Sequence, residues 1–333
     1  MAKPKIAVIG TGGTIASQGA GPLDTQDYGS SGKPLLTADQ LVAGVPELAE
    51  VAEVVAVPFA NIPSTAIGWA DWRALLAAIA KTKQDHPDLA GIVITHGTAT
   101  LEETAYFLSL TMPDDMPVVV TGAQRPFTGL SSDAQMNLVG AARVAGDPQS
   151  RGLGTLVTLN DEIHAAREVT KTSTGRLQTF RSPDVGVLGH VDNDRISYWR
   201  RPTRLLPLSE RFDVTAIGTP PRVDVNYSVI GGDDVAIRAF RAAGAQGIIA
   251  AAFAPGFPSA TERTALAEAA AEGCIVVLSS RAGSGRTFPT RRYGDQGMIT
   301  ADSLNPQKAR VLLMLALTRT RDRAEITDLY ARA

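Results

Sequence analysis

Apolar and polar positions define two kinds of segment that alternate along the chain. Short runs that are apolar throughout, rather than at every second position, are typical of strands buried on both faces of a parallel sheet. Longer segments between them have the spacing of amphipathic helices. The predicted strands are residues 5–10, 51–57, 91–96, 117–121, 154–159, 247–252 and 274–280. The predicted helices are residues 69–83, 100–110, 133–145, 232–243, 258–271 and 305–319.

This alternation predicts an α/β protein with two domains. We expect a large N-terminal parallel-sheet domain with flavodoxin-like layering over residues 1–200, and a smaller C-terminal α/β domain over 222–333. Residues 201–221 are rich in Pro and Arg without a clear period, which predicts a linker. In parallel sheets, ligands bind at the loops that follow the carboxyl ends of the strands. The Gly-rich residues 19–32 are predicted to form a mobile flap.

Charge and composition narrow the classes of partner. The 333 residues contain 32 Lys and Arg against 34 Asp and Glu, without a long run of one sign, so neither a nucleic acid nor a membrane is expected as a partner. No apolar stretch approaches the roughly 20 residues that span a bilayer. The N-terminus lacks a signal-peptide pattern, so we expect a cytoplasmic protein. Cys274 is the single cysteine, which excludes an intramolecular disulfide, and it is predicted to be a buried strand residue.

The first motif, Gly10-Thr-Gly-Gly-Thr-Ile15, follows the first predicted strand. It is close to a dinucleotide-binding fingerprint, but Ile15 stands where the third glycine is needed. The acidic residue expected after the second strand is also missing. The motif therefore predicts a tight turn that presents the hydroxyls of Thr11 and Thr14, and no nucleotide cofactor.

A second motif, Thr95-His-Gly-Thr-Ala-Thr-Leu-Glu-Glu-Thr104, follows the third strand. Its Thr98 places another hydroxyl at the same sheet edge. His96 directly follows the strand and is predicted to be a structural, hydrogen-bonded histidine, whereas Glu102 and Glu103 suit the first turn of a helix. The remaining histidines, which lack metal-ligand spacing and predict no metal site, are His86, His164 and His190.

Lys171 completes the group of candidate catalytic residues. It follows the strand at 154–159, lies among threonines, and has Glu168 as its nearest possible ion-pair partner in sequence. A lysine that is desolvated among hydroxyls can lose its proton and act as a base. A threonine hydroxyl needs such a base, together with backbone N–H groups that stabilise an oxyanion. Two threonines and a lysine therefore indicate nucleophilic catalysis by a hydroxyl group.

Five motifs together resemble the bacterial-type L-asparaginases and glutaminase-asparaginases over nearly the whole chain. They are Ile9-Gly-Thr-Gly-Gly-Thr-Ile-Ala16, Ile94-Thr-His-Gly-Thr-Ala-Thr-Leu-Glu-Glu-Thr-Ala105, Val120-Thr-Gly-Ala-Gln-Arg-Pro126, Asn160-Asp-Glu-Ile-His with Val169-Thr-Lys-Thr172, and Leu304-Asn-Pro-Gln-Lys-Ala-Arg-Val-Leu312. The resemblance implies a two-domain hydrolase without a cofactor, a small amide as substrate, and a homotetramer of intimate dimers.

The resemblance also implies roles for single residues. Thr14 corresponds to the nucleophile, and Tyr28 on the flap corresponds to the residue that helps to activate it. Thr98 and Lys171 correspond to the second catalytic pair. The implied mechanism is a double displacement, in which an ester forms on Thr14, ammonia leaves and water hydrolyses the ester.

The implied substrate site keeps some positions and changes others. Ser64 corresponds to the residue that holds the substrate α-carboxylate, and the carbonyl of Ala123 to the group that meets the leaving amide. Ala99 stands where the family has an aspartate that binds the α-ammonium, and Thr65 where it has a glutamine. Residues 252–257, Ala-Phe-Ala-Pro-Gly-Phe, replace an Asn-containing loop.

Because a buried ammonium without an acceptor costs several kcal/mol, we expect L-asparagine to be a poor substrate. The favoured interpretation is hydrolysis of a carboxamide, imide or lactam that lacks a free α-ammonium. One alternative is a functional L-asparaginase, which releases aspartate and ammonia. An alternative of another class is a catalytically silent protein that binds a small molecule.

Overall fold

The computed structural model describes residues 3–333, which form two compact units that divide between Thr203 and Arg204. Each unit contains its own sheet, the larger one in the first unit. The predicted α/β class, with a large N-terminal sheet and a smaller C-terminal one, is confirmed. A short 3₁₀ helix, Leu208–Glu210, lies within the segment predicted as a linker, and that role stays a prediction.

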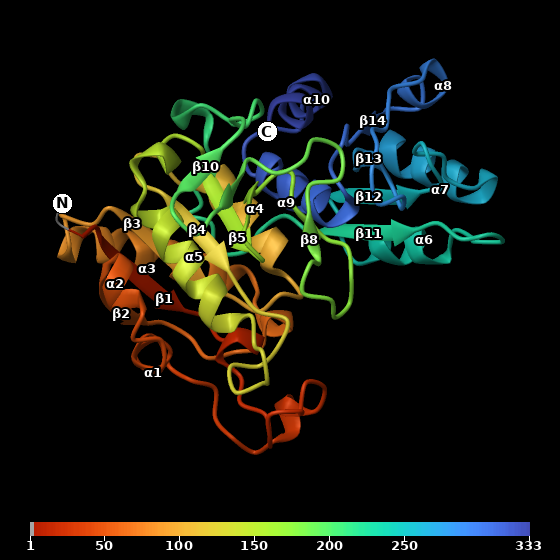
Figure 1. Ribbon diagram of the computed structural model, residues 1–333. Helices are drawn as coiled ribbons and strands as arrows, with labels where there is room; N and C mark the ends of the chain where they lie inside the picture. The colour runs from red at the N-terminus through yellow and green to blue at the C-terminus, as the bar shows by residue number, and fades with distance from the viewer. Residues whose placement is uncertain (1–2) are drawn as a thin grey trace. The chain divides into compact units, whose positions relative to one another are not determined.

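An eight-stranded sheet with the order β10-β9-β6-β5-β4-β3-β1-β2 organises the first unit (Figure 1). The five strands β2-β1-β3-β4-β5 are parallel to one another, and their order is that of flavodoxin-like folds. These strands are β1 (Lys5–Gly10), β2 (Glu53–Pro58), β3 (Gly91–Thr95), β4 (Val118–Thr121) and β5 (Thr155–Leu159). All five were predicted, with bounds that differ by up to two residues.

The remaining strands of the first unit are antiparallel, and they are not among the strands that the sequence predicts. They are β6 (Glu162–Ala165), β9 (Gly189–Val191) and β10 (Ile196–Tyr198). A separate two-stranded hairpin pairs β7 (Thr170–Lys171) with β8 (Phe180–Arg181). Each of these strands has at most four residues and contains at least one polar side chain, so none forms the continuous apolar run that marks a buried strand.

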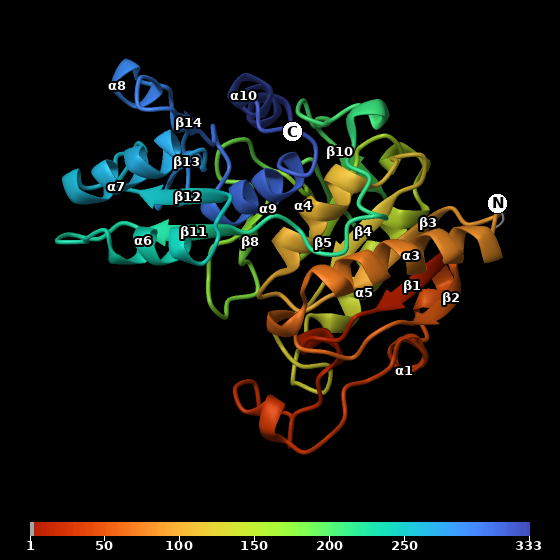
Figure 2. The same cartoon turned by 180° about the vertical axis from the view of Figure 1, so that it is seen from behind.

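Helices cover both faces of the large sheet. Helix α5 packs on one face and helices α3 and α4 on the other, as Figures 1 and 2 show from opposite sides. Alternate residues of β1, Ile6 and Val8, join Leu138 and Ala141 of α5 in one buried cluster. The helices are α1 (Ala38–Ala43), α2 (Leu48–Val51), α3 (Trp69–Asp85), α4 (Leu101–Thr111) and α5 (Ala134–Gly146). Burial on both faces explains why the strands of this region are apolar throughout.

The second unit is built on a four-stranded parallel sheet in the order β11-β12-β13-β14. The strands are β11 (Val223–Tyr227), β12 (Gly247–Ala252), β13 (Ile275–Ser280) and β14 (Met298–Thr300). The helices are α6 (Val235–Ala242), α7 (Ala260–Ala271), α8 (Arg291–Gly294), α9 (Pro306–Ala316) and α10 (Arg323–Arg332). Cys274 is buried as predicted, one residue before β13 begins.

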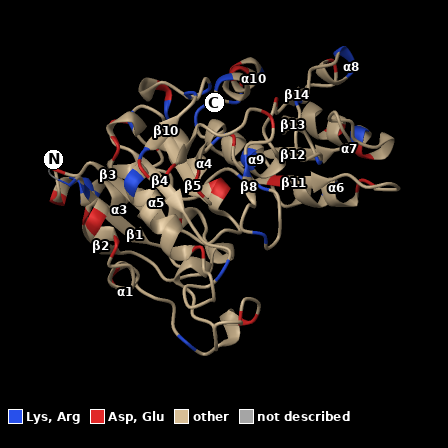
Figure 3. Cartoon of the chain, in the orientation of Figure 1, with Lys and Arg blue, Asp and Glu red and all other residues tan. Residues whose placement is uncertain are grey.

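Charged residues of both signs are spread along the elements of each unit (Figure 3). Among residues 3–333, none of the helices combines the length and the apolar character that crossing a membrane requires.

Candidate active site

The predicted site residues of the first unit gather where the strand order reverses. The chain passes from β1 outward to β2 and then returns to β3 on the other side of β1. Loops that follow β1 and β3 therefore leave the sheet in different directions, which is where open α/β sheets bind ligands. Thr14 opens the 3₁₀ helix Thr14–Ala16 after β1, and Thr98 lies in the turn between β3 and α4.

Glycines allow these two loops to touch through their backbones. Gly12 and Gly13 have φ angles of 101° and 87°, a region that side chains with a Cβ rarely adopt. A Cβ on Gly13 would lie 2.2 Å from the Cα of Gly97, and one on Gly97 would lie 2.7 Å from Ser64 Oγ. The Gly-Gly pair that resembles a nucleotide-binding fingerprint therefore serves close packing between loops.

The loop after β4 completes the base of the site. A Cβ on Gly122 would lie 2.6 Å from the carbonyl oxygen of His96, so this loop also packs against the turn that carries Thr98. The amide of Asn137 donates to the carbonyl of Gly122 at 2.9 Å, and the carboxylate of Asp133 accepts two backbone N–H groups of the same loop. Ala123, which this loop contains, is fully buried.

Two pairs of side chains form among the four predicted catalytic residues. Thr14 Oγ1 lies 2.9 Å from the phenol oxygen of Tyr28, which opens the 3₁₀ helix Tyr28–Ser30 in the predicted flap. Lys171 Nζ donates to Thr98 Oγ1 at 2.8 Å, although 73 positions separate these residues in sequence. The first pair joins two hydroxyl groups, and the second joins an amine to a hydroxyl group.

The surroundings of Lys171 favour the loss of its proton. Its side chain is half-buried, and this desolvation lowers the pKa of the amine, whereas the charge of Glu102 opposes the effect. Glu102 is itself buried in the first turn of α4. Glu168, which is the nearest possible ion-pair partner of Lys171 in sequence, forms an ion pair with Arg200 instead.

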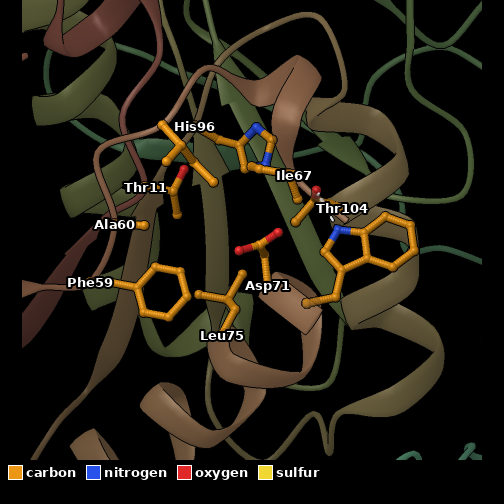
Figure 4. A pocket seen from close by; sticks show the side chains of 10 residues that line it. Thr11, Phe59, Ala60, Ile67, Asp71, Leu75, His96 and Thr104 are labelled. Atoms are coloured by element: carbon orange, nitrogen blue, oxygen red, sulfur yellow. Dashed lines mark hydrogen bonds between the residues drawn. The ribbon is translucent and has the colours of Figure 1, made fainter. Parts of the chain in front are cut away.

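His96 is structural, as predicted. Its Nδ1 lies 2.8 Å from the carbonyl oxygen of Gly97, and burial lowers the pKa of the imidazole to about 4, so the ring is neutral at pH 7. Figure 4 shows the ring at a small pocket that Thr11, Asp71 and Thr104 also line. Because that pocket is mostly apolar and His96 is fully buried, the imidazole is unsuited to act as a general base at neutral pH.

The predicted substrate-binding residues differ in their exposure. Ser64 is buried at the start of the 3₁₀ helix Ser64–Ala66, and its carbonyl accepts a hydrogen bond of 2.9 Å from Thr100 Oγ1. Thr65 and Ala99 are exposed, and neither side chain carries a charge. Within residues 3–333, no group of three or more His, Cys, Asp or Glu is placed to hold a metal ion.

Sequence reasoning missed two contributions to this geometry. One is the electrostatic effect of Glu102 on Lys171, and the other is the support that Asp133 and Asn137 give to the loop of Ala123. The effect of Glu102 had a weak signal in the sequence, since Glu102 lies only four positions after Thr98, in the first turn of a helix. The support from Asp133 and Asn137 had no signal in the sequence, because their partners are backbone groups.

Both halves of the chain match known families. Residues 5–204 match the family described as "Asparaginase, N-terminal", and residues 222–330 match the "Glutaminase/Asparaginase C-terminal domain". L-asparaginase 2 of Escherichia coli (strain K12) is 40% identical over 332 residues, which cover 99% of this chain and 93% of that protein. L-asparaginase 2 of Bacillus subtilis (strain 168) is 39% identical over 327 residues, which cover 97% of this chain and 85% of that protein.

A solved structure agrees with these matches. The crystal structure of a probable cytoplasmic L-asparaginase from Campylobacter jejuni superimposes with a TM-score of 0.93 at 36% identity, covering 99% of this chain and 100% of that one. The fold and the similarities define a hydrolase that acts on carbon–nitrogen bonds other than peptide bonds. The chain belongs to the asparaginase family of amidohydrolases.

Proposed function

We propose that this protein hydrolyses a small carboxamide, or opens a cyclic imide or lactam. We further propose that this substrate lacks a free α-ammonium group. The observation that carries this proposal is the pairing of Thr14 with Tyr28 and of Thr98 with Lys171, beside uncharged side chains at positions 65 and 99.

In the proposed reaction, Thr14 Oγ1 attacks the carbonyl carbon of the substrate. Its proton passes to Tyr28 Oη, which lies 2.9 Å away and hands its own hydroxyl proton on to the leaving nitrogen. The carbon–nitrogen bond then breaks, the nitrogen takes up a proton, and an ester remains on Thr14. A water molecule attacks this ester and gives its proton through Thr98 to the neutral amine of Lys171. As the ester bond breaks, the proton held by Lys171 is returned to the departing Thr14 oxygen. The products are the free acid, the threonine hydroxyl and neutral Lys171, with ammonia released only from open-chain amides.

The choice of substrate rests on Ala99 and Thr65. A methyl group at position 99 offers no acceptor to an ammonium ion, and a threonine hydroxyl at position 65 offers no charge. A loss of about 3 kcal/mol of transition-state binding lowers kcat/KM more than a hundredfold. L-asparagine, which carries an α-ammonium, is therefore expected to react slowly, whereas succinamate presents the same amide and a carboxylate without this group.

L-asparagine hydrolysis is the second candidate function. The observation that favours it is the name of the relatives, because the 39–40% identical proteins of B. subtilis and E. coli are L-asparaginases. Under this alternative, other groups of the assembled enzyme would replace the missing acceptors at positions 65 and 99.

A panel of substrates separates the two candidates. Ammonia release at neutral pH would be measured from L-Asn, D-Asn, L-Gln and succinamate, while succinimide and a simple lactam would be followed by chromatography. We expect turnover of succinamate or a cyclic compound to exceed that of L-Asn, and Thr14→Ala to abolish it. Faster turnover of L-Asn than of every other compound would contradict the proposed substrate class and favour the second candidate.

Assembly and location remain proposals of the same kind. We infer a homotetramer of intimate dimers from the family resemblance, and light scattering that gives a monomer at micromolar concentration would contradict it. We also infer a cytoplasmic enzyme. The protein from Campylobacter jejuni is described as a probable cytoplasmic L-asparaginase, whereas that of Haemophilus influenzae is described as a probable periplasmic L-asparaginase. Immunodetection in cell fractions tests this location, and recovery from an extracytoplasmic fraction would contradict it.

A further inference from the structure

A second polar cluster lies beside the hairpin that carries Lys171. We propose that Glu162, His164 and Ser182 form a brace that holds this hairpin on the main sheet and thereby positions Lys171 against Thr98. The inference deepens the proposed function, because it rests on the role given there to Lys171.

The brace begins on strand β6. Glu162 and His164 are two positions apart, so both side chains leave the same face of the strand. His164 is fully buried, and its Nδ1 lies 3.0 Å from Ser182 Oγ. Its Nε2 lies 3.3 Å from Glu162 Oε2, a long electrostatic contact rather than a well-aligned hydrogen bond. With the proton on Nε2, Nδ1 accepts a hydrogen bond from the hydroxyl of Ser182, and Nε2–H faces the carboxylate of Glu162.

Glu162 makes a further connection to the hairpin. The contact with His164 is the main cause of the lowered pKa of the Glu162 carboxyl group. A hydrogen bond from Gln178 lowers this pKa further, whereas partial burial raises it. Gln178 belongs to the loop between β7 and β8. His190, opposite Glu162 on β9, contributes a smaller electrostatic effect. The carboxylate therefore stays charged at neutral pH and attracts groups from two directions.

The path from the brace to the active site is short. Ser182 directly follows β8, and Phe180 of that strand is paired in register with Lys171 of β7. A hairpin fixed at Ser182 therefore fixes the backbone from which the amine reaches Thr98 Oγ1 at 2.8 Å. If this end of the hairpin moves away from β6, water reaches the amine and removes the desolvation that favours its neutral form.

The three residues also resemble a catalytic Ser-His-Glu arrangement, but burial argues against this role. Ser182 is 5% exposed and His164 is 0% exposed, so a substrate carbonyl has no direct access to the hydroxyl. A nucleophile must reach the atom that it attacks, whereas a positioning residue needs no such access. The arrangement is therefore better suited to holding a segment in place than to chemistry of its own.

The experiment measures the protonation of Lys171 without relying on turnover. The full-length protein would be treated briefly with acetic anhydride over a range of pH, and the acetylated fraction of Lys171 would be read by mass spectrometry. Ser182→Ala is expected to raise the midpoint by about 0.5 to 1 pH unit, since water that reaches the amine removes part of the desolvation that lowers its pKa. Ser150→Ala is the matched control, because Ser150 is also buried and hydrogen-bonded but supports Val144 and Tyr198 instead.

A second variant, Glu162→Gln, keeps the result decisive if Ser182→Ala does not fold. Loss of the negative charge alone would lower the pH midpoint of Lys171 acetylation, whereas loosening of the brace would raise it. The direction of the shift therefore separates the two effects. An unchanged or lowered midpoint in a folded variant would overturn the inference. Loss of turnover in Lys171→Met, measured in parallel, tests the proposed function separately, because the brace can fail while Lys171 remains essential.

Discussion

The two hydroxyl pairs of the candidate site are built in different ways. Tyr28, the partner of Thr14, comes from an irregular segment whose ends are held by hydrogen bonds such as that from Ser31 Oγ to the carbonyl of Gln18. Lys171, the partner of Thr98, comes from a short hairpin, and Thr98 lies in a buried turn packed through glycines. The first pair depends on a surface segment and the second on the folded sheet. Substitutions should therefore affect the two pairs differently.

The largest effect is expected at the buried pair. Lys171→Met removes the amine that accepts the proton, and kcat/KM should fall by about 10² to 10⁴-fold, the usual contribution of a general base. Steady-state kinetics with the best substrate of the panel gives this value, and the melting temperature serves as the control for folding. Retention of more than half of the activity would show that Lys171 is not the base.

The next effect concerns the substrate rather than the catalytic pairs. Ala99→Asp restores a carboxylate beside Thr98, and kcat/KM for L-Asn should rise by about a hundredfold, as the recovery of about 3 kcal/mol of ammonium binding implies. Activity on succinamate should fall or stay constant in the same preparation. An unchanged ratio of kcat/KM for L-Asn to kcat/KM for succinamate would mean that position 99 does not face the α-substituent of the substrate.

A smaller effect is expected at the exposed pair. Tyr28→Phe removes the hydroxyl that lies 2.9 Å from Thr14 Oγ1 but keeps the ring. We expect kcat/KM to fall by about tenfold, less than at Lys171, because Thr14 is only partly buried and a water molecule can take over part of the proton transfer. Lys33→Met, which removes only a hydrogen bond from Nζ to the carbonyl of Gly19 in the same segment, is a control for general loosening. Equal losses in both variants would indicate that Tyr28 acts through the segment and not through its hydroxyl.

The smallest effect is a shift in pH dependence. Because the proposed reaction needs neutral Lys171, kcat/KM should rise with pH through the pKa of this amine, which burial lowers and Glu102 raises. Glu102→Gln removes the opposing charge, so the pKa falls further and the acid limb moves to lower pH, by about one unit or less. A limb that moves to higher pH would mean that Glu102 does not act through the charge of Lys171.

The sequence predicts the parallel core well because its strands are buried on both faces and carry continuous apolar runs. Strand β12, Gly247–Ala252, has the predicted bounds for this reason. Strand β6 was missed because Glu162 and His164 occupy alternate positions among four residues, and their partners come from a distant hairpin. Short antiparallel strands of this kind depend on contacts that a local pattern does not contain.

In the candidate site, too, local patterns predict some features, whereas others depend on contacts between segments that are distant in sequence. The motifs predict a chemical role for Thr14, Thr98 and Lys171, because unusual hydroxyl-rich turns follow buried strands. The pairing of Lys171 with Thr98 was expected only from the family resemblance, because it depends on a hairpin register 73 positions away from Thr98 that no local pattern contains. Exposure of Ala99 and burial of Ser64 likewise follow from the packing of separate loops.

The most direct test of the account is the location of the acyl group during turnover. The enzyme would be mixed with succinamate, quenched in acid, digested and examined by mass spectrometry. We expect a succinyl ester on the peptide that contains Thr14, and its absence in Thr14→Ala. Steady turnover of succinamate with an unmodified Thr14, or with the succinyl group on Thr98, would contradict it.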